Sequence, residues 1–121
     1  MVLTLPLTKE TERLIGEDEL RTMKKTSYLL NLSRGRIIQQ DKLIQALKEG
    51  WIAGAGLDAF ENEPLPQQSQ LWGLRNVIIT PHVAWSTPFY LDRLISGFCN
   101  NLTRFTNSKP LNNIIDKAQG Y

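Results

Sequence analysis

The chain has 121 residues, enough for one domain with a buried core and too few for two domains of ordinary size. Its 14 Lys and Arg residues and 12 Asp and Glu residues are scattered along the sequence and give a formal net charge of +2. A charge so close to neutral shows no basic patch for nucleic acid or for a membrane surface, so we expect neither partner.

Cysteine usage and hydropathy favour the cytoplasm. The single Cys99 cannot form an intrachain disulfide, and its place in a predicted amphipathic helix predicts a buried, inert thiol. No apolar stretch approaches the roughly 20 residues of a membrane-spanning helix. The N-terminus has no basic segment followed by an apolar core, so we expect no signal peptide.

Strands and helices alternate in the first half of the chain. Short apolar runs predict strands, and apolar residues at three- and four-residue spacing predict helices. In chain order we expect a strand at Val2–Leu5, a helix at Glu17–Met23, a strand at Ser27–Leu32 and a helix at Gln40–Glu49 that stops at Gly50. Gly35, after the second strand, allows a tight or left-handed turn.

The second half continues this alternation. We expect a strand at Trp51–Leu57, a surface loop at Glu61–Ser69, a packing turn at Leu71–Trp72, a strand at Asn76–Thr80 and a tail at Lys109–Tyr121. A long helix that Ser86 or Thr87 caps precedes the tail. Its apolar face must pack on another surface, and consists of Leu91, Leu94, Ile95, Phe98, Leu102 and Phe105.

This order of elements predicts an α/β fold in which about four parallel strands are joined by right-handed crossovers. Strands as apolar as Val77-Ile78-Ile79 are expected to be covered on both faces. The first strand would then need a neighbour on its other side from outside the chain.

Three ionisable residues follow the ends of predicted strands, namely Arg34, Glu63 and His82. The carboxyl ends of parallel strands meet at one edge of a sheet, where open α/β folds bind their ligands. A guanidinium, a carboxylate and an imidazole at one edge predict proton transfer on an anionic substrate.

Each of these side chains suits one role. His82 is the only histidine and the natural general acid or base. A carboxylate that binds it would stabilise the imidazolium, and Glu63 and Glu61 are equally placed for this by spacing. Arg34 can bind a substrate carboxylate through two hydrogen bonds, although Arg36 is as suitable by composition.

Other residues carry weaker signals. Asp58 ends the third predicted strand and can orient a ligand amide or cap the next turn. Trp85, three residues after His82, can pack or can line the mouth of the pocket. The sequence has no Cys/His cluster for a metal, no Ser/His/Asp arrangement and no glycine-rich phosphate loop, so we predict no metal site.

Four motifs occur in register, and they are Leu5-Pro6-Leu7-Thr8 with Glu10-Thr11, Asn31-Leu32-Ser33-Arg34-Gly35, Gly54-Ala55-Gly56-Leu57-Asp58 through Glu63-Pro64, and Thr80-Pro81-His82. Together they resemble the C-terminal half of the NAD-dependent D-isomer-specific 2-hydroxyacid dehydrogenases, in particular the hydroxypyruvate and glyoxylate reductase-like members. The resemblance implies that residues 1–85 are the second half of a Rossmann-like doubly wound sheet. Residues 86–121 would be a long helix and tail that return to the substrate domain.

The resemblance also implies a reaction, hydride transfer between NAD or NADP and a small 2-oxo or 2-hydroxy acid. It implies that Arg34 binds the substrate carboxylate, that His82 is the acid/base, and that Glu63 rather than Glu61 pairs with His82. Asp58 would hold the nicotinamide carboxamide. Further positions of the cofactor site would be Pro6, Thr11, Ser33 and Trp85, the last in place of a glycine that is common in the family.

Two other interpretations stay open. Transcriptional corepressors of the same fold keep the three residues and act as dinucleotide-sensing binding modules. The isolated chain is also expected to be inactive, because the family's glycine-rich phosphate loop, which supplies much of the cofactor affinity, lies upstream of the matching region. An uncovered strand edge and an apolar helix face predict self-association, so we expect a homo-oligomer.

Overall fold

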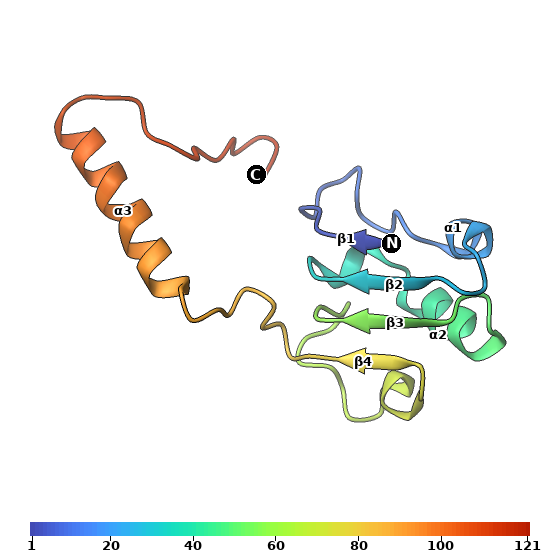
Figure 1. Cartoon of the computed structure of the whole chain (residues 1–121). Helices are drawn as coiled ribbons and strands as arrows, with labels where there is room; N and C mark the ends of the chain where they lie inside the picture. The colour runs from blue at the N-terminus through green and yellow to red at the C-terminus, as the bar shows by residue number, and fades with distance from the viewer. The chain divides into compact units, whose positions relative to one another are not determined.

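The computed structural model describes residues 1–121, which form two compact units, Met1–Ala84 and Trp85–Tyr121. The first unit is built on a four-stranded parallel sheet with the strand order β1-β2-β3-β4 (Figure 1). The predicted α/β class and parallel sheet are therefore confirmed. The strands are β1 (Val2–Leu3), β2 (Tyr28–Asn31), β3 (Gly54–Leu57) and β4 (Val77–Ile79).

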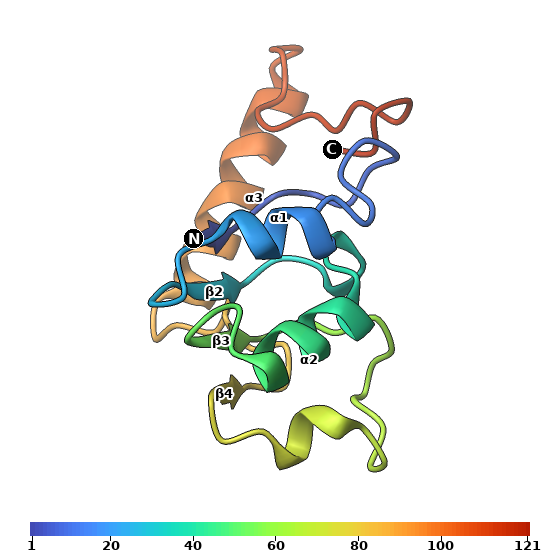
Figure 2. The same ribbon diagram turned by 90° about the vertical axis from the view of Figure 1, so that its right-hand side faces the viewer.

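Helical segments connect successive strands. Helix α1 (Glu17–Thr22) lies between β1 and β2, the short helix η1 (Gly35–Ile37) and α2 (Gln40–Glu49) lie between β2 and β3, and η2 (Gln70–Gly73) precedes β4. Helices α1 and α2 contact each other, and Figure 2 shows them side by side in front of the strands. The crossovers thus place both α-helices of this unit on one face of the sheet.

Helix α2 ends where the sequence predicts, but β3 begins later than predicted. Gly50 adopts a left-handed conformation with a φ of 69°, which costs a residue without a Cβ little. The Trp51 N–H donates a hydrogen bond of 2.8 Å to the carbonyl of Ala46 in α2. Because Trp51 closes the helix in this way, the strand starts only at Gly54.

The hydrophobic core fills the space between the helices and one face of the sheet. Side chains of β2 alternate across the sheet, so that Leu29 and Asn31 are buried whereas Tyr28 is exposed. The core residues that are at most 1% exposed are Leu20, Leu29, Ile37, Leu43, Ala46, Ile52 and Leu71. This packing fixes the strands whose ends carry the candidate site.

The expectation that both faces of the sheet are covered is not met within the first unit. Val2, Leu30, Gly56 and Ile78 are in register across the four strands, and the side chains of Val2, Leu30 and Ile78 are all exposed, that of Ile78 by 73%. Tyr28 on the same face is 61% exposed. The physical reason is that the first unit supplies helices to one face only, whereas a doubly wound sheet has helices on both.

The second unit consists of helix α3 (Tyr90–Thr106) and a tail. The helix starts later than its predicted caps at Ser86 or Thr87, because no side chain caps it and the first N–H, that of Tyr90, donates to the Thr87 carbonyl at 3.1 Å. No residue of α3 is buried, so Cys99 is exposed and the predicted buried thiol is wrong. Neither α3 nor any other helix is long and apolar enough to cross a membrane.

Candidate active site

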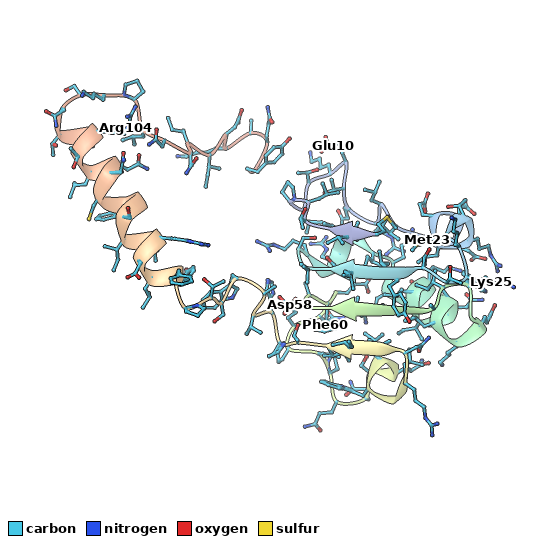
Figure 3. The ribbon with its side chains drawn as sticks, in the orientation of Figure 1. Glu10, Met23, Lys25, Asp58, Phe60 and Arg104 are labelled. Carbon is cyan, nitrogen blue, oxygen red and sulfur yellow. The ribbon has the colours of Figure 1, made fainter.

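The candidate site lies at the carboxyl edge of the sheet, where the loops after all four strands meet. The four arrowheads in Figure 1 point toward this edge, and Figure 3 shows Asp58 and Phe60 just beyond the tip of β3. A pocket of about 210 Å³ is formed there. Its lining combines all three ionisable residues singled out in the sequence with five others, and consists of Leu7, Arg34, Gly35, Arg36, Phe60, Glu61, Glu63 and His82.

His82 is held in an unusual backbone conformation. Its φ is 56°, in the left-handed region that non-glycine residues rarely occupy, although histidine does so more often than most. Asp58 fixes the chain on both sides of it. The Asp58 carboxylate accepts a hydrogen bond from the Thr80 hydroxyl, one from the Val83 N–H at 2.9 Å and one from the Ala84 N–H at 2.8 Å.

Of the two uses that the sequence allows for Asp58, the structure contains the turn cap. The side chain is only 1% exposed. Burial acts to raise the pKa of Asp58 and is the largest single effect, but the hydrogen bonds from Thr80, Ala84 and Val83, with the charge on His82, together lower that pKa below its ordinary value. Asp58 is thus a charged anchor for the loop that carries His82.

Glu63 pairs directly with the imidazole. Its Oε2 lies 2.8 Å from Nδ1 of His82, while its Oε1 accepts a hydrogen bond of 2.9 Å from the Phe60 N–H. Burial acts to raise the pKa of Glu63, but these two bonds and the charges of His82 and Arg34 lower it overall. The carboxylate is therefore ionised at neutral pH and oriented by its own loop.

Glu61, the rival by spacing, also lines the pocket, but its carboxylate binds α2 and not His82. Its Oε1 accepts a hydrogen bond of 3.1 Å from the N–H of Gln40, the first residue of α2. Spacing alone could not separate Glu61 from Glu63, because both lie on one loop and the path of that loop decides which carboxylate reaches His82.

The two arginines also differ. Arg36 forms an ion pair with Glu12. The Arg34 guanidinium is exposed and donates through Nη1 to the carbonyl of its neighbour Ser33 at 2.8 Å. Because a guanidinium has five N–H donors, Arg34 retains enough of them to bind a carboxylate in the pocket.

Of the tight or left-handed turn predicted at Gly35, the structure has the tight turn, because Gly35 is the first residue of the 3-10 helix η1 and its φ is not positive. A Cβ on Gly35 would lie 1.8 Å from the carbonyl carbon of Phe60, so the residue allows the loop after β3 to rest directly on the backbone beside Arg34. Leu7 and Phe60 line the pocket but were missed in the sequence, because apolar side chains carry no chemical signal. The adjacency of β1 and β2 would have indicated Leu7.

The remaining predicted cofactor residues have internal partners. The Ser33 hydroxyl donates to Asn31 Oδ1 at 2.9 Å, and the Thr11 hydroxyl donates to the Pro6 carbonyl at 2.7 Å. These bonds shape the loops after β2 and β1. Trp85 belongs to the second unit, where its ring lies 4.7 Å from that of Tyr90.

Comparison with known proteins places this chain in a family. Residues 1–84 match the family described as D-isomer specific 2-hydroxyacid dehydrogenase, NAD binding domain, and the chain belongs to that family. Curated relatives include a glyoxylate reductase of Korarchaeum cryptofilum, 44% identical over 115 residues, which are 95% of this chain and 35% of the relative. The glyoxylate reductase of Thermofilum pendens is 55% identical over 98 residues, 81% of this chain and 29% of the relative.

Solved structures agree with this assignment. An NADPH-dependent glyoxylate/hydroxypyruvate reductase from Sinorhizobium meliloti, in complex with NADP and sulfate, superposes with a TM-score of 0.91 at 31% identity, over 99% of this chain and 39% of that one. A D-isomer specific 2-hydroxyacid dehydrogenase from Xanthobacter autotrophicus, in complex with NADPH and MES, superposes with a TM-score of 0.89 at 37% identity, over 99% of this chain and 49% of that one. The chain spans about a third of the length of its curated relatives.

Proposed function

We propose that this chain is the part carrying the catalytic residues of an oxidoreductase that transfers a hydride between NAD(P)H and a small 2-oxo or 2-hydroxy acid. The observation that carries the proposal is the pocket at the carboxyl edge of the sheet, where Arg34 and the paired Glu63 and His82 line one wall. Membership of the dehydrogenase family supports the same reaction.

In the proposed reaction the three side chains have separate tasks. Arg34 binds the substrate carboxylate and so orients the carbonyl carbon. Glu63 pairs with Nδ1 of His82 and orients the imidazole, and the proposal assigns to Nε2 the exchange of a proton with the substrate oxygen. In reduction the protonated His82 gives this proton to the developing alkoxide, and in oxidation the neutral imidazole accepts it.

The residues of the chain fit the nicotinamide end of the cofactor, which supplies or accepts the hydride when bound. Asp58 Oδ2 accepts one hydrogen bond, from Ala84, and so has capacity for a carboxamide N–H. Pro6, Thr11 and Ser33 lie on the loops after β1 and β2 and are part of the same proposal, as is Trp85. The pyrophosphate would be held by residues outside this sequence, which has no glycine-rich phosphate loop.

The proposed substrate class is that of small 2-oxo acids such as glyoxylate and hydroxypyruvate, which the relatives' names support. We also propose a homo-oligomer, because α3 exposes a row of large apolar side chains and β1 is an edge strand. A cytoplasmic location completes the proposal, since the reaction would draw on the nicotinamide cofactors kept inside cells.

The test uses a chimera in which this chain follows the part of the Thermofilum pendens glyoxylate reductase that precedes its 98 matched residues. We expect NAD(P)H oxidation with glyoxylate. Substitution His82→Ala should lower kcat by about 10²- to 10⁴-fold, the usual contribution of a general acid or base. Arg34→Ala should raise KM as well, because substrate binding is also lost.

The control is Lys25→Ala, which removes an exposed charge from a turn remote from the carboxyl edge and should leave both constants unchanged (Figure 3). An active chimera whose kcat is the same with and without the His82 imidazole would contradict the proposal. The isolated chain should show weak NADH binding by cofactor fluorescence and no turnover, because the pyrophosphate contacts are missing.

A further inference from the structure

The loop after β3 carries three acidic residues, Asp58, Glu61 and Glu63, and the proposed reaction has no use for Glu61. Its carboxylate accepts a hydrogen bond of 3.1 Å from the Gln40 N–H, and its own N–H donates to Gln40 Oε1 at 3.4 Å. Gln39, the N-cap residue of α2, gives no side-chain hydrogen bond to the helix. The reciprocal pair therefore joins the loop to the first turn of α2 and satisfies a helix N–H group that has no partner within the helix.

The same loop aims Glu63 at the imidazole. The Phe60 N–H, one residue before Glu61, donates to Glu63 Oε1 at 2.9 Å, and Glu63 Oε2 lies 2.8 Å from His82 Nδ1. The Phe60 carbonyl also rests on Gly35, where a Cβ would lie only 2.0 Å from its oxygen. The residue that orients Glu63 is thus held from one side by Gly35 and from the other through Glu61.

Gln40, the partner of Glu61, follows Arg34 closely in the sequence. Arg34 is the N-cap of η1, which ends at Ile37, and the extended residues Ile38 and Gln39 connect η1 to α2. The first turn of α2 is thus joined through η1 and two further residues to Arg34, which presents the guanidinium. A bond between this turn and the loop of Glu63 sets the spacing of the cation from the carboxylate–imidazole pair.

We propose that Glu61 is a positioning residue, which binds the first turn of α2 and thereby holds the loop that aims Glu63 at His82 at a fixed place relative to Arg34. Its importance for turnover rests on the proposed function, whereas its effect on the Glu63–His82 bond does not. A carboxylate that merely capped α2 would leave that bond unchanged when removed, provided that the chain stays folded.

The test is NMR spectroscopy of the 121-residue chain, which contains one histidine, so that the imidazole signals belong to His82 alone. Amide exchange of Gln40 reports the bond to Glu61. The imidazole ¹⁵N shifts report which ring nitrogen carries the proton, and the side-chain carboxyl signal of Glu63 reports its titration. The variants are Glu61→Ala, Glu61→Gln and Glu61→Asp.

The control is Asp41→Ala, which removes an exposed acidic group from the same first turn of α2. Glu61→Gln keeps an oxygen that can accept from Gln40, and should preserve the spectra of the unsubstituted chain. Glu61→Ala should speed exchange of the Gln40 amide, raise the pKa of Glu63 toward its ordinary value and abolish the preference for a proton on Nδ1 of His82. Glu61→Asp keeps the charge but shortens the reach, so it should shift the same signals and stands in if the alanine variant does not fold.

Either of two results would overturn the proposal. One is a Gln40 amide that exchanges as fast in the unsubstituted chain as in the alanine variant, which would mean that the bond is absent. The other is loss of Gln40 protection in a folded Glu61→Ala or Glu61→Asp variant with the Glu63 titration and His82 protonation unchanged. Neither readout depends on cofactor or substrate, so a failure here is distinct from a failure of the proposed reaction.

Discussion

Substitution of Gly35 by alanine should be far more damaging than the same change at Gly73, a glycine of the first unit with open space around it. The new Cβ would lie 1.8 Å from the carbonyl carbon and 2.0 Å from the oxygen of Phe60, and 2.4 Å from the Glu61 nitrogen. All three are backbone atoms, which cannot rotate away. For the new Cβ to reach an ordinary contact distance of 3.4 Å from the Phe60 carbonyl carbon, the loop must move by about 1.6 Å.

Forced expansion of a packed site costs typically about 1–3 kcal/mol and occasionally more. We expect the free energy of unfolding to fall by the upper part of that range, which is a large fraction of the roughly 5–15 kcal/mol of a typical domain. The displaced loop carries Glu63, so the Glu63–His82 bond should weaken at the same time. In the chimera a misplacement of this size should lower turnover by about 10²-fold or more.

The assay is urea unfolding followed by tryptophan fluorescence, because Trp51 is 9% exposed and reports on the first unit. The matched control is Gly73→Ala, since a Cβ at Gly73 meets no atom within 4 Å and its φ is not positive. That control should be neutral or more stable by about 0.4–1 kcal/mol. Equal stabilities of the Gly35→Ala and Gly73→Ala variants, within about 0.5 kcal/mol, would refute the reasoning from close backbone contact.

Two further outcomes are expected. The pKa of Asp58 is lowered from its ordinary 3.8 and that of Glu63 from 4.5, so their stabilising contribution is complete above those values and is lost as the pH falls through the lowered pKa of each group. Urea midpoints measured from neutral to acidic pH should therefore fall on acidification, and Asp58→Asn should make that fall shallower. Light scattering should show a mass that grows with concentration, because α3 exposes Phe98 by 67% and Phe105 by 71%, and a constant monomer mass would contradict the proposed self-association.

Local signals in the sequence were sufficient for much of the fold. Helix α2 was predicted with the bounds that it has, because its apolar spacing and Gly50 are properties of adjacent residues. The start of β3 was not predicted correctly. Trp51 is apolar enough for a strand, but its N–H binds the carbonyl of Ala46 in α2. Residues that lie at strand ends, such as Arg34 and His82, were found because strand ends can be located from short apolar runs.

What the sequence could not predict depends on the path of the chain or on surfaces outside it. Glu61 and Glu63 differ by two positions on one loop, and only the turn at Phe60 directs one to α2 and the other to His82. Burial was overestimated for Cys99 and Ile78 because apolar periodicity indicates which face is to be covered without indicating what covers it. The resemblance to the dehydrogenase family, through the order and spacing of the motifs, had already indicated that Glu63 rather than Glu61 pairs with His82.

The anchoring of Asp58 has a consequence for how the two units are joined. Its carboxylate binds the amides of Val83 and Ala84, and Ala84 is the last residue of the first unit. A change in backbone conformation that begins at Trp85 would therefore have to break the hydrogen bonds of Val83 and Ala84 to the buried Asp58 carboxylate before it could reach His82. The segment that carries His82, the proposed general acid or base, is therefore fixed within the first unit by Asp58, although only seven residues separate His82 from the start of α3.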